Sequence, residues 1–215
     1  MPLGINSTDA DECPTVATNR HHFFFVSSRP GGCGGQDLWM SFRRDRDSQS
    51  AWEEPQNLGC EINTSFNDFT PTHFEDESGV STLYFTSCRP GCDIYASTQR
   101  ADGTWGPGVP VAELNTESND SRPNVSRDGL ELYFESNRAG TLGLQDVWVS
   151  TRPSTSSPWS TPENLGPDVN STAADGRPSL AFDRTTLYFH STRAGGAGGT
   201  DLYVTTRSRG TGKPE

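Results

Sequence analysis

One motif recurs four times along the chain and constrains its fold more than any other feature. Each copy begins with N-[ST]-x3-D-x2-P, continues into an aromatic run that ends in S-x-R, and closes with a loop before D-[LIV]-[YW]. The copies start at Asn6, Asn63, Asn115 and Asn170. A repeat of this length predicts stacked units, because one unit alone cannot bury its apolar faces.

Each unit carries signals for four short antiparallel strands. We expect the motif proline to open the first strand, because proline lacks an N–H donor and is tolerated at a first strand position. A turn such as Asp128-Gly129 then leads to the aromatic second strand. That strand is apolar at consecutive positions, as in Leu132–Phe134, so both of its faces must be covered. A third strand and a weaker fourth strand complete what is typical of a propeller blade.

The repeat spacing predicts a single domain over residues 1–215. The last unit stops at Glu215 without a complete fourth strand, and a short segment from Met1 precedes the first repeat. Read end to end, the two termini resemble the internal boundary T-P-E-N-L-G-P-D-V-N-S-T. We therefore expect an all-β, four-bladed propeller of four-stranded antiparallel blades whose last blade is closed by the N-terminal segment, which leaves no exposed sheet edge. The alternative is a fragment of a larger propeller, or a propeller completed by a second copy.

Charge and hydropathy exclude two classes of function. The formal net charge is −11 at pH 7, whereas nucleic-acid binding requires a basic surface. No apolar run approaches the roughly 18 residues of a membrane span. The first residues lack the basic and apolar regions of a signal peptide, so export would require a signal absent from this sequence. We expect a monomer that binds a protein, a glycan or a small-molecule ligand.

The last two repeats resemble a known family. Arg122–Trp148 and Arg177–Tyr203 fit the pattern R-P-x-x-S-x-D-G-x-x-L-Y-F-x-S-x-R with a glycine-bearing loop and D-[LV]-[YW]. This pattern is similar to the TolB-like, WD-type β-propeller repeat of bacterial exported proteins. The first two repeats are looser, since Cys13 and Thr70 stand where the motif has Arg. The resemblance implies a secreted or periplasmic binding or scaffold module, and it implies no particular activity.

The five cysteines permit disulfides. Cys88 and Cys92 bracket a predicted tight hairpin turn, whose two stems can meet the distance that a disulfide needs. Cys13, Cys33 and Cys60 fall around the first blade and predict one disulfide and one leftover thiol. A soft-metal site is the alternative, which the lack of a histidine at suitable spacing disfavours. A disulfide would indicate an oxidising compartment.

Four aspartates recur just before the inner strands, at the predicted channel mouth. They are Asp11, Asp68, Asp120 and Asp175. One interpretation is a turn residue that accepts backbone N–H bonds. The other is a carboxylate ring that holds Ca²⁺ or another hard divalent cation, which prefers oxygen ligands. The S-x-R arginines are expected to pair across their hairpin with the third-strand aspartates, as Arg138 with Asp146 and its three counterparts.

Positions that differ between blades indicate a ligand site better than repeated positions do, because a residue that recurs in every blade most simply has a structural role in the blade. On the loop-bearing face, the candidate ligand-binding residues are Glu12, Arg122, Asn137, Arg177 and Thr192. They include no nucleophile paired with a base, so we assign no catalytic residue. His73 and His190 are expected to be structural.

Three functions stay open at this point. The first is an exported binding or scaffold module that uses the loop-bearing face, with a cation at the channel mouth. The second is a glycan-cleaving hydrolase or lyase that uses channel-mouth aspartates as acid and base. The third is a purely structural or designed repeat protein. An unpaired carboxylate with a raised pKa in a cleft would favour the enzyme, whereas aspartates tied to arginine or backbone would favour the binding module.

Overall fold

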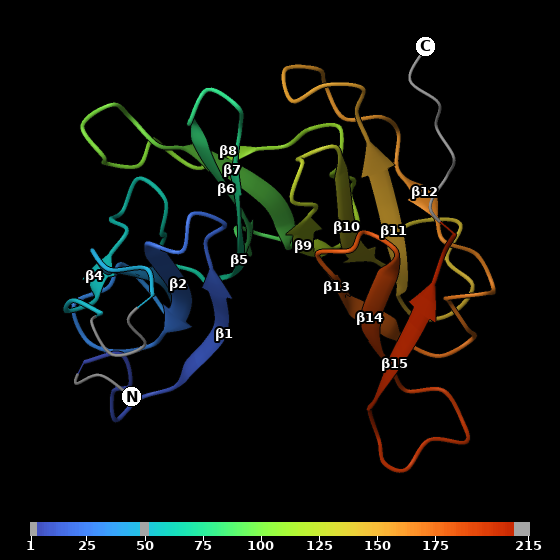
Figure 1. Ribbon diagram of the computed structural model, residues 1–215. Helices are drawn as coiled ribbons and strands as arrows, with labels where there is room; N and C mark the ends of the chain where they lie inside the picture. The colour runs from blue at the N-terminus through green and yellow to red at the C-terminus, as the bar shows by residue number, and fades with distance from the viewer. Residues whose placement is uncertain (1–3, 48–51, 209–215) are drawn as a thin grey trace.

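The computed structural model describes residues 4–47 and 52–208 and contains four antiparallel sheets (Figure 1). The first blade contains β1 (Asp11–Val16), β2 (His22–Ser27), β3 (Asp37–Phe42) and β4 (Gln56–Asn57), and the second contains β5 (Asp68–Glu75), β6 (Ser81–Ser87), β7 (Asp93–Thr98) and β8 (Val109–Pro110). The third contains β9 (Asp120–Val125), β10 (Glu131–Ser136), β11 (Asp146–Thr151) and β12 (Glu163–Asn164), and the last contains β13 (Asp175–Leu180), β14 (Thr186–Ser191) and β15 (Asp201–Thr206). The strands of each blade are paired in chain order, which confirms the predicted four-bladed, all-β propeller. The described residues contain no helix that could cross a membrane.

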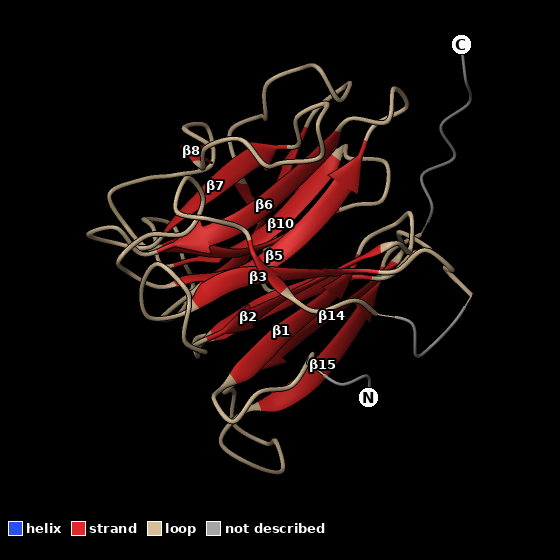
Figure 2. Cartoon of the chain, turned by 90° about the vertical axis from the view of Figure 1, so that its left-hand side faces the viewer, coloured by secondary structure: helices blue, strands red, loops and turns tan. Residues whose placement is uncertain are grey.

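The second strand of each blade lies at the centre of its sheet. In the first three blades it is buried on both faces, as its sequence predicts, whereas in the last blade Tyr188 of β14 is 51% exposed. In β10, Leu132 and Phe134 pack into a cluster with the second blade, while Tyr133 faces the last blade and packs near Phe189. Figure 2 shows that the sheets are twisted. The core is therefore a series of seams between neighbouring blades.

The inner strands begin earlier than predicted. β9 starts at Asp120 instead of at Pro123, and its register against β10 shifts between Tyr133 and Glu135. Each of the other three inner strands has the same irregularity. The extra residue of such a bulge admits a proline to a strand interior, because the proline there need not donate to the ladder.

Two disulfides are present, as predicted. Cys33 and Cys60 connect the β2–β3 loop to the segment that leads into the second blade. Cys88 and Cys92 close the β6–β7 hairpin loop. Cys13 is a half-buried free thiol on β1, which confirms the expectation of one leftover cysteine.

The last blade has three strands among the described residues, whereas each of the others has four. The predicted closing segments, Met1–Leu3 and residues 209–215, lie outside the described residues. Ile5 packs against Phe25 and Trp39 of the first blade. No described strand of the first blade contacts a described strand of the last blade, so three of the four seams are formed in this structure.

Candidate functional site

A cavity of about 230 Å³ lies between the four inner strands. Each blade contributes the three residues centred on its motif proline: Cys13–Thr15, Thr70–Thr72, Arg122–Asn124 and Arg177–Ser179. The prolines make the wall rigid, because their φ angles are fixed. The residue that precedes each proline is the one that differs most in chemistry from blade to blade.

These four variable residues all have a left-handed backbone. The φ angles of Cys13, Thr70, Arg122 and Arg177 are 50°, 49°, 55° and 49°. Such angles are uncommon outside glycine and cost about 1–3 kcal/mol each. The bulge imposes this conformation at the same position in every blade. The four side chains thus occupy equivalent positions around one cavity.

Glu135 connects the two arginines of this ring. Its side chain is 3% exposed and forms an ion pair with Arg122. It also accepts hydrogen bonds from the backbone N–H of Arg177 at 2.9 Å and from the hydroxyl of Ser121 at 3.2 Å. The Arg122 guanidinium lies 5.6 Å from the ring centroid of Phe69. Glu135 therefore fixes Arg122 and neutralises one of the two positive charges.

Sequence reasoning missed Glu135. Its only signal is a carboxylate inside an aromatic strand, at a position where the other blades have Val26, Thr86 and His190. The Thr86 hydroxyl accepts a hydrogen bond from the Arg122 backbone N–H at 2.8 Å, as Glu135 does from that of Arg177. A buried carboxylate needs such donors, which only the next blade supplies.

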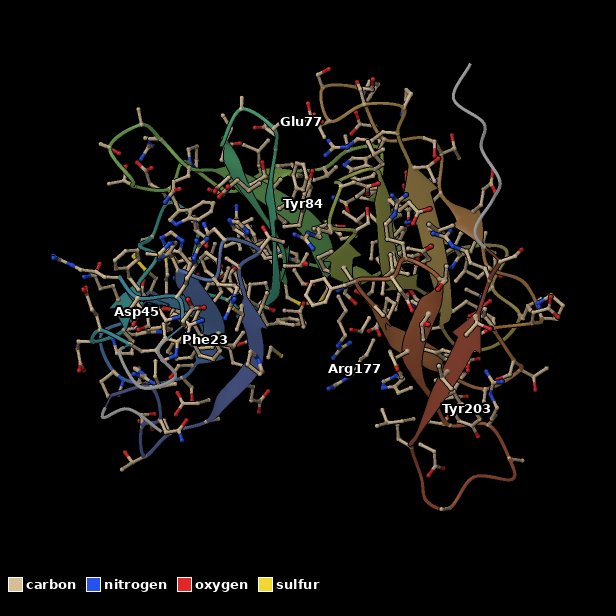
Figure 3. The ribbon with its side chains drawn as sticks, in the orientation of Figure 1. Phe23, Asp45, Glu77, Tyr84, Arg177 and Tyr203 are labelled. Carbon is tan, nitrogen blue, oxygen red and sulfur yellow. A yellow bond between two sulfur atoms is a disulfide. The ribbon has the colours of Figure 1, made fainter. Side chains whose placement is uncertain are left out.

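Arg177 is the exposed member of the pair. Figure 3 shows its side chain extending away from the last blade, on the side that faces the first blade. The guanidinium has no hydrogen-bond or ion-pair partner among the described residues, although it lines the cavity. Burial raises the pKa of the nearby Cys13 thiol, and the positive charges of Arg177 and Arg122 oppose that rise. Among the residues that the structure describes, the site therefore keeps one uncompensated cation, Arg177.

The other predicted ligand-binding residues do not line this cavity. Glu12 is exposed on β1. The Asn137 side chain accepts a hydrogen bond from the backbone N–H of Asn119 at 2.9 Å, and the Thr192 hydroxyl accepts one from Ala174 at 3.1 Å. Asn137 and Thr192 thus hold the loops that enter the inner strands. Of the five predicted residues, the cavity brings together Arg122 and Arg177.

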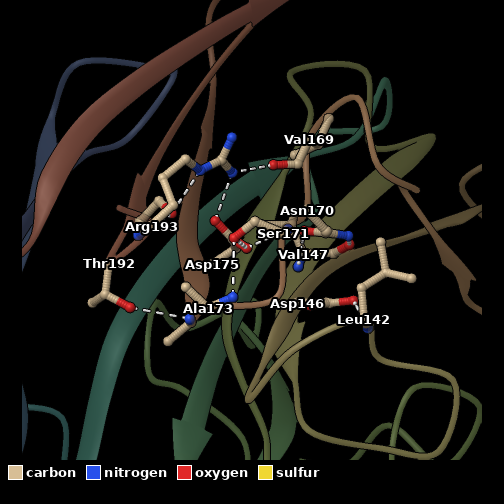
Figure 4. A network of polar contacts seen from close by, with 12 residues as sticks. Leu142, Asp146, Val147, Val169, Asn170, Ser171, Ala173, Asp175, Thr192 and Arg193 are labelled. Atoms are coloured by element: carbon tan, nitrogen blue, oxygen red, sulfur yellow. Dashed lines mark hydrogen bonds and ion pairs between the residues drawn. The ribbon is translucent and has the colours of Figure 1, made fainter. Parts of the chain in front are cut away.

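Three of the four motif aspartates are bound to arginine within their own blade. Asp175 accepts hydrogen bonds from the backbone N–H and hydroxyl of Ser171 at 2.6 and 2.7 Å and pairs with Arg193 at 2.7 Å (Figure 4). The corresponding pairs are Asp11 with Arg29 at 2.7 Å and Asp120 with Arg138 at 2.5 Å. Burial alone would raise the pKa of Asp11, but the hydrogen bonds from Ser7 and Arg29 outweigh it and lower this pKa to about 2.

The predicted pairing of these arginines with the third-strand aspartates is wrong. The Arg138 guanidinium turns back to Asp120 and also donates to the backbone carbonyl of Leu114 at 2.5 Å. Asp146 instead accepts hydrogen bonds from the backbone N–H of Leu142 and the side-chain amide of Asn164, both at 2.7 Å. In this orientation the Arg138 guanidinium reaches both a carboxylate and a backbone carbonyl, which are more acceptors than Asp146 alone would offer.

Asp68 departs from this arrangement. Arg89 donates to the hydroxyl of Ser87 and to the carbonyl of Ile62. One carboxylate oxygen of Asp68 accepts two hydrogen bonds from Thr64, while the other has no partner among the described residues. Burial raises the pKa of Asp68. Asp68 is thus the one motif aspartate with an unmatched oxygen in the described part of the chain.

The aspartates give no direct support to a cation site. Within residues 4–47 and 52–208, no group of three or more His, Cys, Asp or Glu side chains is placed to hold a metal ion. The four motif aspartates bind mainly within their own blades. The channel-mouth Ca²⁺ therefore stays a prediction.

The two candidate histidines differ in burial. His73 is 6% exposed and stacks on Phe24 at 5.5 Å between ring centroids, with Trp105 at its edge. Burial lowers its pKa to about 4, and neither ring nitrogen has a hydrogen-bond partner among the described residues. His190 is half-buried on β14, and burial also lowers its pKa. His73 is thus a core residue, as predicted.

Comparison with solved structures gives the fold and no close relative. TolB from Acinetobacter baumannii matches 94% of this chain with a TM-score of 0.58 and 13% identity, and this chain spans 42% of it. An endo-arabinase from Bacteroides thetaiotaomicron matches 93% with a TM-score of 0.60 and 17% identity, and 75% of it is covered. The Hadza microbial sialidase Hz136 matches 91% with a TM-score of 0.56 and 15% identity, with 44% covered.

The sequence itself matches no protein-family model and no curated protein. The chain spans less than half the length of the TolB and sialidase chains. The predicted likeness to TolB-like propellers is confirmed at the level of the fold. Because these proteins have different activities on one architecture, the function must be argued from the site.

Proposed function

We propose that the protein is a binding module whose central cavity holds an anionic group of its ligand, such as a carboxylate or phosphate. The observation that carries this proposal is the pair Arg122 and Arg177 on one cavity wall. The carboxylate in contact with them, Glu135, is buried and already bound to Arg122 and to backbone. Arg177 therefore retains guanidinium donors for the oxygen atoms of a carboxylate or phosphate.

The remaining walls fit binding better than catalysis. They consist of prolines, threonines, an asparagine, a serine and the Cys13 thiol. None of these forms a nucleophile–base pair with a neighbour, and burial raises the pKa of the thiol, which keeps it protonated. The arginines are carried on strands that two neighbouring blades hold rigidly, which favours a preformed binding site.

Binding of galacturonate, galactose and inorganic phosphate, measured by calorimetry, tests this proposal. We expect the two anions to bind and the neutral sugar to bind more weakly. Arg177→Ala should weaken anion binding about 10- to 100-fold, because a hydrogen bond to a charged group contributes about 1.5–3 kcal/mol. The matched control is Arg184→Ala, which removes the same charge from the β13–β14 turn of the same blade, where Arg184 pairs with Asp128.

Equal losses in the two variants would show that only overall charge matters and would contradict a site at Arg177. The absence of binding by both anions would contradict the proposal itself.

A glycan-cleaving activity is the second candidate. It is favoured by the unmatched oxygen and raised pKa of Asp68 and by the fold shared with a family-43 glycoside hydrolase and an endo-arabinase. Asp68 has no solvent-exposed surface, so a substrate would reach it only after the β5 region moves. Release of reducing sugar from arabinan or xylan that Asp68→Asn abolishes would support this activity, and no release from either would remove it.

Export and a bound cation belong to the same proposal. Two disulfides are compatible with a secreted or periplasmic location, because such bonds persist in oxidising compartments. A hard divalent cation such as Ca²⁺ at the channel mouth would offset the acidic net charge. The partner would be a protein, a glycan or a small molecule that carries the anionic group.

A further inference from the structure

The three formed seams between blades share one set of contacts. At each of these seams, the motif asparagine of one blade bonds to a single third-strand residue of the preceding blade. Its side-chain oxygen accepts a hydrogen bond from the backbone N–H of that residue, and its side-chain amide donates one to the backbone carbonyl of the same residue. These clamps are Asn63 on Leu38 at 2.8 and 3.0 Å, Asn115 on Ile94 at 2.9 and 2.9 Å, and Asn170 on Val147 at 2.8 and 2.9 Å. One residue type at one position thus fastens each blade to the one before it.

A second contact accompanies each clamp. The backbone N–H of the motif aspartate donates to the carbonyl just before the preceding third strand. The bonds are Asp68 to Gln36, Asp120 to Cys92 and Asp175 to Gln145, at 2.7, 2.7 and 2.9 Å. The loop between the second and third strands also lies very close to the next blade. A Cβ on Gly34 or Gly143 in this loop would lie 2.1 Å from a carbonyl oxygen of that blade.

The last blade presents the same surface, and no described strand of another blade covers it. Leu202 is 88% exposed, whereas its counterparts Leu38, Ile94 and Val147 are fully buried. Tyr188 and Val204 on the same face are 51% and 59% exposed. An apolar sheet face of this kind costs free energy while it is in water.

The residues that would complete a fourth seam are all on the first blade. Asn6 occupies the clamp position, and Ile5, Phe25 and Trp39 form an apolar cluster. In the first formed seam, the corresponding Ile62, Phe85 and Tyr95 pack with Leu38. Gly198 stands at the loop position of Gly34 and Gly143, although a Cβ there would meet nothing within 4 Å in this structure.

We propose that this exposed face of the last blade binds the first blade of the same chain, with Asn6 clamping the backbone of Leu202 and the Asp11 N–H donating to the Thr200 carbonyl. The inner strands of both blades already line one cavity, so the two faces belong to one ring. Because they are tethered, their effective concentration favours closure within the chain over pairing with a second copy.

Hydrogen exchange of the Leu202 amide, followed by NMR on the monomeric protein, tests the fourth seam. We expect it to exchange at least about 100-fold more slowly than an exposed amide, and Asn6→Ala to abolish this protection. Asn170→Ala is the positive control and should deprotect Val147. Gly198→Ala should lower the Tm, as expected of Gly143→Ala, because its Cβ would meet the first blade.

Rapid exchange of Leu202 in the wild-type protein would overturn the proposal. Protection that appears only with rising protein concentration, together with a dimer mass in sedimentation, would overturn it in favour of a second copy. The test does not involve Arg122 or Arg177, so its failure would leave the proposed binding function untouched.

Discussion

At the scale of single residues, the Asp–Arg pair repeated in three of the four blades holds the inner strand to its hairpin. Arg138 is 9% exposed and its partner Asp120 is inaccessible to solvent. The guanidinium also lies over the rings of Phe134 and Trp148. Because the carboxylate is already satisfied by these contacts, it serves the blade and is a poor candidate for an acid or base.

Removing this arginine should be costly. Arg138→Ala leaves the Asp120 carboxylate buried without its cation, and loss of one partner of a buried pair costs about 3–5 kcal/mol. The matched control is Arg89→Ala in the second blade, where the arginine does not bond to the carboxylate of Asp68. Urea unfolding should show a larger loss for Arg138→Ala. Equal losses would contradict a stabilising role for the ion pair.

His73 should make stability depend on pH. Its pKa in the folded protein is about 4, against an ordinary value of 6.5, so the unfolded chain binds more protons between these values. Stability therefore rises with pH through this window and is lost as pH falls from about 6.5 to 4, by about 3 kcal/mol. His73→Phe keeps a ring between Phe24 and Trp105 and should flatten this part of the curve. Parallel curves for the two proteins would contradict the assignment.

At the scale of elements, the loops between the second and third strands decide how blades are joined. The β2–β3 loop is tied to the second blade by the Cys33–Cys60 disulfide and by the hydrogen bond from Gln36 to the Asn67 side chain. In the second blade, the Cys88–Cys92 disulfide closes a short loop upon itself. The first bond therefore joins two blades, and the second shapes one hairpin.

The two disulfides should differ in their effect on stability. Cys33 and Cys60 are separated by 27 residues and Cys88 and Cys92 by 4. Loop-closure entropy predicts losses of about 3.5 and about 2 kcal/mol when the respective pairs are replaced by serine. Thermal unfolding of the two double-serine variants measures the difference. A greater loss from the short loop would show that constraint of the unfolded chain is not the main contribution.

At the scale of the whole molecule, four blades surround one cavity that carries positive charge inside an acidic protein. The net charge of −11 disfavours the approach of anions over long distances, so any selectivity for them must arise at contact with Arg177. The same acidity suits a bound cation, which would raise stability if it binds only the folded state.

Removal of divalent cations tests this last point. If Ca²⁺ is bound at the channel mouth, EDTA should lower the Tm and added Ca²⁺ should restore it, whereas Mg²⁺ should restore it less. A Tm unchanged by EDTA would contradict the prediction of a bound divalent cation.

The number of blades, the second and third strands of each blade and a disulfide between Cys88 and Cys92 could be predicted from the sequence, as could one disulfide among Cys13, Cys33 and Cys60 without its pairing. These features depend on local periodicity, on turn residues and on the spacing within hairpins, all of which can be read from the amino-acid sequence. The inner strands are the exception, because each begins before its motif proline and contains a bulge that only the strand register reveals.

The pairing of charges depends on contacts that form only when the chain is folded. Ser136 pairs with both Asp120 and Asp146 across its two neighbouring strands, so either aspartate is within reach of Arg138. Arg138 pairs with Asp120 because on that side the backbone carbonyl of Leu114 supplies a further acceptor. Likewise, Glu135 joins Arg122 to the backbone of Arg177 across a seam, and no spacing within one repeat predicts a contact between blades.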